Sequence, residues 1–241
     1  MSKAVSLIVE KRFQGPEGMG NGGYVSGLVA EAVGGPAKIR LLAPTPLDRE
    51  LHLVQDADAQ VVRLRDGDTV LVEGEALGKP LDLDPIPTPP GDEAIREARA
   101  NFPTRAQHMA VDCFVCGPDR DPAEALRLLT GRHSDTHLAA DHWVPDGSLA
   151  DADGLVATRY VWAALDCPSY FATGLVDTPA LLGGIAGQVV RRPAPGERLT
   201  VTGWPLERDG RKHHSGSVIH DADGQAIAMA RALWIEPKGG L

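Results

Sequence analysis

Residues 13–33, FQGPEGMGNGGYVSGLVAEAV, decide the fold that this sequence predicts. The part over residues 15–23 is rich in glycine and is typical of a loop. Over residues 24–33 the apolar residues recur at helical spacing, which predicts a helix. The glycine pair at 34–35 is a stop signal for that helix. Since a strand is expected before the loop, over residues 4–13, the chain begins with a strand, a glycine-rich loop and one apolar helix.

Short strands follow this helix, and the same order of parts returns in the second half of the chain. In the first half, strands are predicted at residues 37–43, 49–55, 58–65 and 69–77. In the second half, the sequence predicts a short helix at 92–101, strands at 126–130 and 136–144, a long apolar helix at 155–172, and strands at 184–192, 198–208, 212–220 and 225–235. Pro168 would kink the long helix, because proline cannot donate to the carbonyl four residues earlier.

An internal repeat supports the division into two halves. The pair Pro44 and Pro46 returns at an offset of 149, and the turn Asp66-Gly67 returns at an offset of 157. A strand, a loop, a central helix and an antiparallel meander, present twice, are the plan of the hotdog fold. We therefore predict an α+β fold of two tandem hotdog units that form an internal pseudo-dimer, each with an antiparallel sheet around its helix. The expected boundaries are 1–79 for the N-terminal unit, 80–110 for a proline-rich linker and 111–241 for the C-terminal unit.

Composition and charge exclude several classes of function. The chain has 241 residues and a formal net charge of −9, whereas nucleic-acid binding needs a basic surface. No run of about 18 apolar residues is present, as a membrane span would require. The N-terminus lacks the long apolar stretch of a signal peptide, and three cysteines are too few for a disulfide framework. We expect a cytoplasmic protein with no nucleic-acid or membrane partner.

Several short motifs give the chain a resemblance to a known family. FQG at 13–15, GNGGY at 20–24 and PTP at 44–46 resemble the first half of acyl-CoA thioesterases of the thioesterase II type. CFVCGP at 113–118 resembles the opening of phenylacetate-pathway-type thioesterases, and WAALD at 162–166 resembles their helix with a catalytic acid. The chain is thus similar to double-hotdog thioesterase-like proteins over most of its length.

This resemblance implies hydrolysis of acyl-CoA thioesters, with the acyl-pantetheine arm between the two halves. It makes Asp166 the catalytic base or nucleophile and counts Asn21 as the second catalytic residue. The amides of Gly22, Gly23 and Tyr24, at a helix start, would stabilise the oxyanion. No cofactor or metal is implied.

Purely structural roles remain open for these residues. Asp166 can be a carboxylate at a helix kink, and Asn21 can be a helix N-cap. Many hotdog thioesterases carry His-Gly-Gly where this chain has Asn21-Gly22-Gly23. This departure keeps a second function open, a non-catalytic hotdog protein that binds acyl-CoA or lipid.

Two further groups of residues have more than one interpretation. Cys113 and Cys116, with His133 and His137, could bind zinc, or the thiols could be small apolar core residues. A redox pair would need a thioredoxin-like setting, which the sequence does not show.

Basic residues gather at Arg191-Arg192 and over residues 208–214. We assign Arg191, Arg192 and Lys212 provisionally to the phosphates of CoA, although a solvated hairpin explains the second group equally well. A homodimer is the expected assembly.

Overall fold

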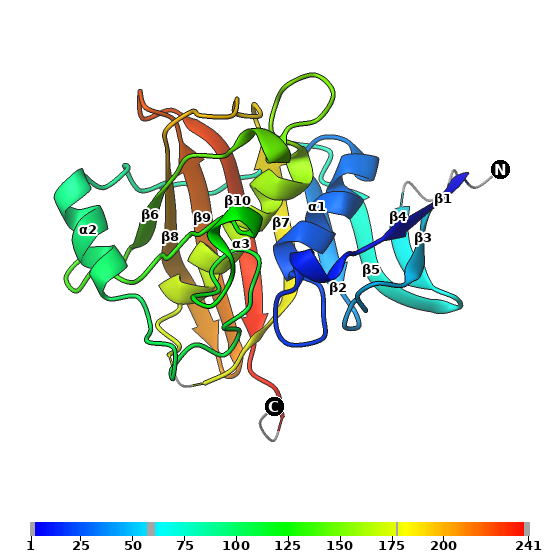
Figure 1. Cartoon of the computed structure of the whole chain (residues 1–241), viewed down its shortest axis with the longest axis horizontal. Coiled ribbons are helices and arrows are strands. Elements are labelled where there is room, and N and C mark those ends of the chain that lie inside the picture. The colour runs from blue at the N-terminus through cyan, green and yellow to red at the C-terminus, as the bar shows by residue number, and fades with distance from the viewer. Residues whose placement is uncertain (1–2, 57–60, 177, 239–241) are drawn as a thin grey trace.

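The computed structural model describes residues 3–56, 61–176 and 178–238 (Figure 1). Its helices are α1 (Gly22–Val33), α2 (Asp92–Ala100) and α3 (Thr158–Ala172). The strands of the first half are β1 (Lys3–Ile8), β2 (Ala37–Leu41), β3 (Glu50–Asp56), β4 (Val61–Asp66) and β5 (Thr69–Ala76). The strands of the second half are β6 (Ala139–Trp143), β7 (Leu181–Val189), β8 (Leu199–Asp209), β9 (Lys212–His220) and β10 (Ala226–Ile235). No helix in these described ranges is long and apolar enough to cross a bilayer.

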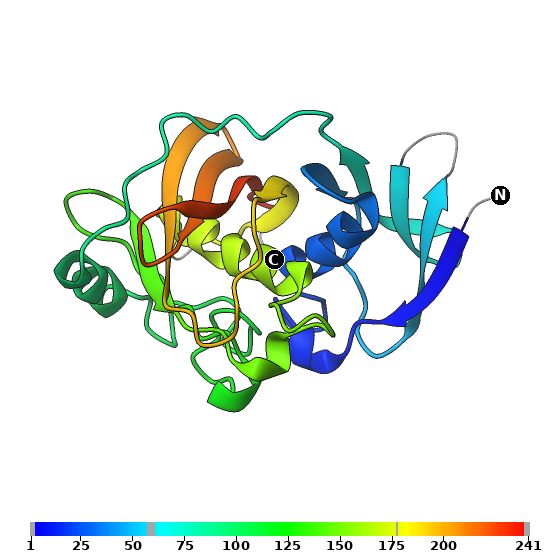
Figure 2. The same ribbon diagram turned by 90° about the horizontal axis from the view of Figure 1, so that it is seen from above.

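The described strands form one ten-stranded antiparallel sheet. Its order is β1-β3-β4-β5-β2-β7-β10-β9-β8-β6, so each half contributes five neighbouring strands. The halves join where β2 pairs with β7, in a register that places Ile39 opposite Ile185. We call this β2–β7 pairing the seam. Helices α1 and α3 lie side by side, and the sheet curves around both (Figures 1 and 2).

Helix α3 is the centre of the core. Apolar residues surround it on all sides, and Ala163, Ala164 and Leu165 are fully buried. A helix that is apolar all round has no face for solvent, so it packs against both the sheet and α1. The helix continues through Pro168, and the hydroxyl of Ser169 donates to the Asp166 carbonyl at 2.6 Å. Because Asp166 belongs to this central helix, its side chain lies in the interior of the molecule.

Glycine allows α1 and α3 to approach each other closely. A Cβ atom on Gly27 would lie 2.4 Å from the Cα of Arg159, and one on Gly23 would lie 2.5 Å from the Cβ of Asp166. Both distances are far below ordinary van der Waals contact. The backbone of α1 therefore touches α3 directly, and it brings the start of α1 to the middle of α3.

The predicted order of elements is present in both halves, with local differences. The strand expected at 126–130 is wrong: Arg127 has a φ of +56°, outside extended backbone, and the segment is irregular. Its amides at Leu126 and Leu128 still bond to the segment around Phe114. The strand expected at 4–13 ends at Ile8, because residues 11–13 form a short 3-10 helix. Residues 58–60 of the strand expected at 58–65 lie outside the described residues.

The segment between β5 and α2 passes from the first half to the second along one edge of the molecule (Figure 2). It is mostly extended, as its prolines predict, but it also packs. The side chain of Leu83 is buried against Trp204 and Val218, and the amide of Leu81 donates to the Gln188 side chain at 2.8 Å. This connection is therefore attached to the second half.

Candidate active site

The carboxylate of Asp166 faces the N-terminus of α1. Its Oδ2 atom accepts hydrogen bonds from the amide of Gly23 at 2.8 Å and from Asn21 Nδ2 at 3.0 Å. Its Oδ1 atom is buried and has no hydrogen-bond partner among the described residues. One oxygen of the acid is thus held by α1, while the other has no hydrogen-bond partner in the described part of the chain.

The ionisation of Asp166 is shifted towards neutral pH. Burial raises its pKa to about 7, against the opposing effect of the hydrogen bond from Gly23. The nearby Cys113 raises the pKa further, and the hydrogen bond from Asn21 lowers it. A carboxylate with this pKa is a far stronger base than an exposed aspartate, and it remains partly ionised near pH 7.

The start of α1 offers one free amide. Asn21 is the N-cap, since its Oδ1 accepts from the amide of Tyr24 at 2.9 Å. The Gly23 amide is bound by Asp166, whereas the Gly22 amide has no acceptor in the described part of the chain. Of the three amides predicted as oxyanion donors, only that of Gly22 is free. The Tyr24 ring stacks on Phe13 at a centroid distance of 3.9 Å, within the core.

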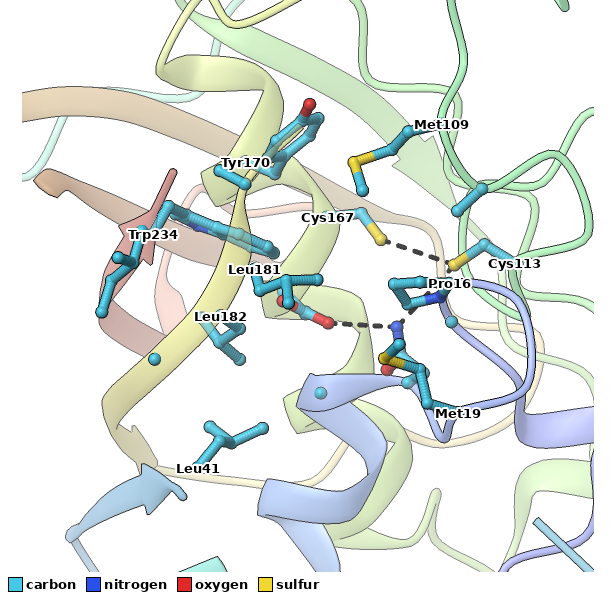
Figure 3. A pocket seen from close by; sticks show the side chains of 18 of the residues that line it. Pro16, Met19, Leu41, Met109, Cys113, Cys167, Tyr170, Leu181, Leu182 and Trp234 are labelled. Carbon is cyan, nitrogen blue, oxygen red and sulfur yellow. Dashed lines mark hydrogen bonds between the residues drawn. The ribbon is translucent and has the colours of Figure 1, made fainter. Parts of the chain in front are cut away.

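A cavity of about 320 Å³ opens beside these groups. Asn21, Gly22 and Asp166 lie in its wall, which combines parts of both halves. The remaining wall is mainly apolar and includes Met19, Leu41, Tyr170, Leu181, Leu182 and Trp234 (Figure 3). Such a wall suits an acyl chain or another apolar group, with the carboxylate and the free amide as the polar features.

The two cysteines and two histidines considered above as zinc ligands do not converge among the described residues. His133 Nε2 pairs with Glu97 at 3.1 Å, and its Nδ1 accepts the amides of Asp135 and Thr136. Cys113 and Cys116 instead meet a third thiol, Cys167, and the three Sγ atoms lie within 4.8 Å of one another. Cys167 was not among the predicted site residues, although it directly follows the candidate acid Asp166 in the sequence.

The predicted phosphate-binding cations lie away from the cavity wall. Arg191 pairs with Glu197 at 2.5 Å and Asp221 at 2.9 Å. Arg192 pairs with Asp151 at 3.1 Å and also contacts Asp153. Lys212 is exposed at the start of β9, and its neighbour Arg211 is the residue of the 208–214 group that lines the cavity. The basic segment at 208–214 was identified from the sequence, but Arg211 was not singled out within it.

A similar contact occurs at the N-terminus of α3, where an acid from α1 accepts a backbone amide of α3. Glu31 of α1 accepts the amide of Arg159, the second residue of α3, at 2.8 Å, just as Asp166 accepts that of Gly23. Here the Arg159 guanidinium also binds Glu31, at 3.1 Å, and bonds to Asp151 at 3.1 Å. The start of α3 is thus occupied by an ion pair between Glu31 and Arg159, which was not predicted from the sequence. The Tyr-Val pair that follows both Gly23 and Arg159 was a possible signal.

Comparisons with known proteins agree on the fold. No protein-family model matches the chain, and no curated protein matches it. A solved structure from Novosphingobium aromaticivorans, provisionally named a thioesterase, is 12% identical, covers 98% of this chain and 96% of its own, and has a TM-score of 0.62. The tesB protein of Mycobacterium avium subsp. paratuberculosis is 14% identical, with 98% and 93% covered and a TM-score of 0.61. A structure from Thermobifida fusca, provisionally named a thioesterase II, is 15% identical, with 98% and 92% covered and a TM-score of 0.58.

These similarities extend over nearly the whole chain. Together with the sheet order and the two central helices, they show that the chain has the double-hotdog fold of these structures. The predicted α+β fold of two tandem hotdog units is confirmed.

Proposed function

We propose that the protein hydrolyses acyl-CoA thioesters in the cavity beside Asp166. The observation that carries this proposal is that Asp166 and Gly22 line one largely apolar cavity, while the buried Oδ1 of Asp166 and the Gly22 amide have no partner among the described residues. A base and an amide donor at a helix N-terminus are the two groups that attack on a thioester carbonyl requires. The thioesterase names of the structural neighbours agree with this chemistry.

In the proposed reaction the acyl chain occupies the apolar wall and the thioester carbonyl oxygen points to the Gly22 amide. Asp166 Oδ1 accepts a proton from a water molecule as the water oxygen attacks the carbonyl carbon. The negative charge on the carbonyl oxygen is stabilised by the Gly22 N–H and by the positive end of the α1 dipole. When the tetrahedral intermediate collapses, the C–S bond breaks and the protonated Asp166 returns its proton to the leaving thiolate. The products are the free acid and CoA.

Replacement of the acid tests the proposal. We expect Asp166→Asn to lower kcat by at least about a hundredfold, because the amide cannot accept the proton of water. The measurement is thiol release from short, medium, long and aromatic acyl-CoAs. The variant should remain folded, since an amide oxygen can still accept from Gly23 and Asn21. Above pH 7 its Tm should equal or exceed that of the wild type, because it carries no buried charge. Unchanged turnover in this variant would falsify the assignment of Asp166.

Arg211 is the cation that we assign to the phosphates of CoA. It is exposed and lines the cavity, and it is tied to the chain end by a bond to the Glu236 carbonyl. We expect Arg211→Ala to raise KM for acyl-CoA about three- to tenfold, and to leave KM unchanged for an acyl-pantetheine that lacks the nucleotide. Lys212→Ala, an exposed neighbour outside the cavity wall, is the matched control. An equal effect of the two substitutions on acyl-CoA would argue against this role.

A binding function without hydrolysis is the second candidate. The observation that favours it is the single free amide at the start of α1, because Asp166 already holds that of Gly23. Calorimetric titration with a non-hydrolysable acyl-CoA analogue separates the two functions. Binding without thiol release from any acyl-CoA in the panel would support the second function and exclude the first.

A further inference from the structure

All three cysteines of the chain lie in the wall of the candidate active site. Cys113 and Cys116 come from the irregular segment that follows α2, and Cys167 comes from α3, next to Asp166. The Sγ atoms of Cys113 and Cys167 are 3.9 Å apart, and Figure 3 shows the two side chains directed at each other. All three cysteines are buried in the fold and also line the cavity, so a small reagent that enters the cavity comes next to the cluster.

The surroundings of Cys113 favour a thiolate. Its sulfur accepts the amide of Val115 at 3.4 Å and Asn21 Nδ2 at 3.8 Å. Hydrogen bonds from the thiols of Cys116 and Cys167, together with those from backbone amides, hold the pKa of Cys113 well below its usual range. Hydrogen bonds to Cys113 and Cys116, with burial, raise the pKa of Cys167. Cys113, the more readily ionised thiol, therefore faces Cys167, which holds its proton more strongly, and this is the arrangement of an attacking and a resolving cysteine.

We propose that Cys113 and Cys167 form a peroxide-oxidisable dithiol that inactivates the site when it becomes a disulfide. The Cys113 thiolate attacks one oxygen of a hydroperoxide and the O–O bond breaks. Cys113 becomes a sulfenic acid, and the released oxyanion takes a proton to become water or an alcohol. The Cys167 sulfur then attacks the Cys113 sulfur, an S–S bond forms, and water leaves with the thiol proton. The two sulfurs lose two electrons in total, and the peroxide gains them.

The link would change the site through its geometry. The S–S bond is about 2.05 Å long, so the two sulfurs must approach by nearly half of their present separation. The movement acts on the part of α3 that carries Asp166 and on the Cys113 sulfur to which Asn21 donates. Asn21 and Asp166 share a hydrogen bond, so both polar groups of the site are affected. This effect on hydrolysis rests on the proposed function, whereas formation of the link does not.

A metal site is the competing interpretation of the same thiols. Closed zinc sites in proteins have four ligands, whereas this cluster provides three. The neighbouring carboxylate of Asp166 is outside the cluster, and its Oδ2 is held by Gly23 and Asn21. These contacts favour the dithiol, and bound metal is treated as an outcome of the experiment.

The experiment uses the full-length chain, fully reduced and then titrated with hydrogen peroxide. Free thiols are alkylated, and mass spectrometry reports both the loss of two hydrogens and the linked cysteines. Cys116→Ser is the matched control, because it removes the third thiol and leaves the pair. We expect the wild type and Cys116→Ser to form the Cys113–Cys167 link, to lose most of their hydrolysis and to regain it with dithiothreitol. Cys113→Ser and Cys167→Ser should not form this link.

Three results would overturn the proposed disulfide itself. The first is a disulfide between Cys113 and Cys116 in place of the Cys113–Cys167 disulfide. The second is that all three thiols remain reduced in the presence of hydrogen peroxide. The third is that the thiols resist oxidation until a chelator removes one equivalent of metal, which would show that the cluster is a metal site. Formation of the link without loss of hydrolysis would overturn the inactivation. Reduced protein that forms the link but hydrolyses no acyl-CoA would instead count against the proposed function.

Discussion

Asp166 is subject to opposing influences that set its usefulness as a base. Burial favours the protonated form, and the two donors at the start of α1 favour the ionised form. The net pKa of about 7 leaves both forms populated at neutral pH. Because the base must be ionised to accept a proton, the rate should rise with pH through this pKa and then level off.

Asn21 provides a test of this balance. Its side chain donates to Asp166 and lowers the pKa of the acid, so Asn21→Ala should raise that pKa and move the acid limb of the kcat/KM profile to higher pH. Asn21→Asp should move it further, because it removes the donor and adds a like charge. The pH profile of acyl-CoA hydrolysis is the measurement. An acid limb that stays at the same pH in both variants would contradict the assignment.

The two Asn21 variants also control for stability. Asn21 caps α1 through the amide of Tyr24, and an alanine at an N-cap costs about 1 kcal/mol. Aspartate keeps the cap. If Asn21→Ala and Asn21→Asp differ in Tm but shift the pH profile in the same direction, the shift arises from the acid and not from loosening of the helix.

Part of this candidate site could be predicted because its signals lie within a few residues of one another in the sequence. A carboxylate in the apolar stretch before Cys167 and a glycine pair behind Asn21 are each unusual by themselves, and both are in the site. Arg211 and Cys167 were not singled out because their importance arises from the meeting of segments far apart in the chain. Which amide remains free could not be predicted either, since it depends on the rotamer of Asp166.

At the scale of elements, the crossing of α1 and α3 determines the position of the site. We expect Gly27→Ala to destabilise the protein by about 1–3 kcal/mol, because the new Cβ would meet the backbone of Arg159, which cannot rotate away. This cost should exceed the gain of about 1 kcal/mol in helix propensity that alanine has over glycine. Chemical denaturation measures the change.

A glycine in open space is the matched control for Gly27. A Cβ atom on Gly147 would have no neighbour within 4 Å, so Gly147→Ala should change the free energy of unfolding by no more than about 0.5 kcal/mol. A Gly27→Ala variant as stable as Gly147→Ala would show that the two helices can separate without cost, contrary to the close contact described above.

The elements themselves were predictable to different degrees. Alternation and turns predicted the hairpins near Asp66-Gly67 and Asp223-Gly224, because these contacts are local. The segment at 126–130 has the composition of a strand, but its pairing is only partial and Arg127 leaves the extended region. Composition does not reveal a left-handed backbone conformation at a residue other than glycine, such as Arg127.

At the scale of the whole molecule, the seam makes the two halves one sheet. Ile39 and Ile185 face each other across it, and both are buried. We expect Ile185→Ala to cost about 2–5 kcal/mol and to lower the Tm of the whole protein in one transition, because both halves share this contact. Calorimetry tests this through agreement between the van't Hoff and calorimetric enthalpies.

Val190 is the control for the seam. Its side chain is 59% exposed just beyond β7, and Val190→Ala should change the free energy of unfolding by about 0.5 kcal/mol or less. Two separate transitions in the Ile185→Ala variant would mean that the halves unfold independently. The sequence predicted two such halves but not their register, because the seam joins residues nearly 150 positions apart.

The pairing of Glu31 with Arg159 has a consequence for how this molecule could arise. In a dimer of identical chains, every substitution appears twice, so an arginine that occupied one site would occupy the other as well. Within a single chain the two positions can diverge. One helix start can keep small residues next to the carboxylate of Asp166, while the other acquires an ion pair between Glu31 of α1 and Arg159 of α3. Because the two units are joined in a single chain, their helix starts can differ. The start of α1 lines the cavity, whereas the start of α3 is held to α1 by an ion pair.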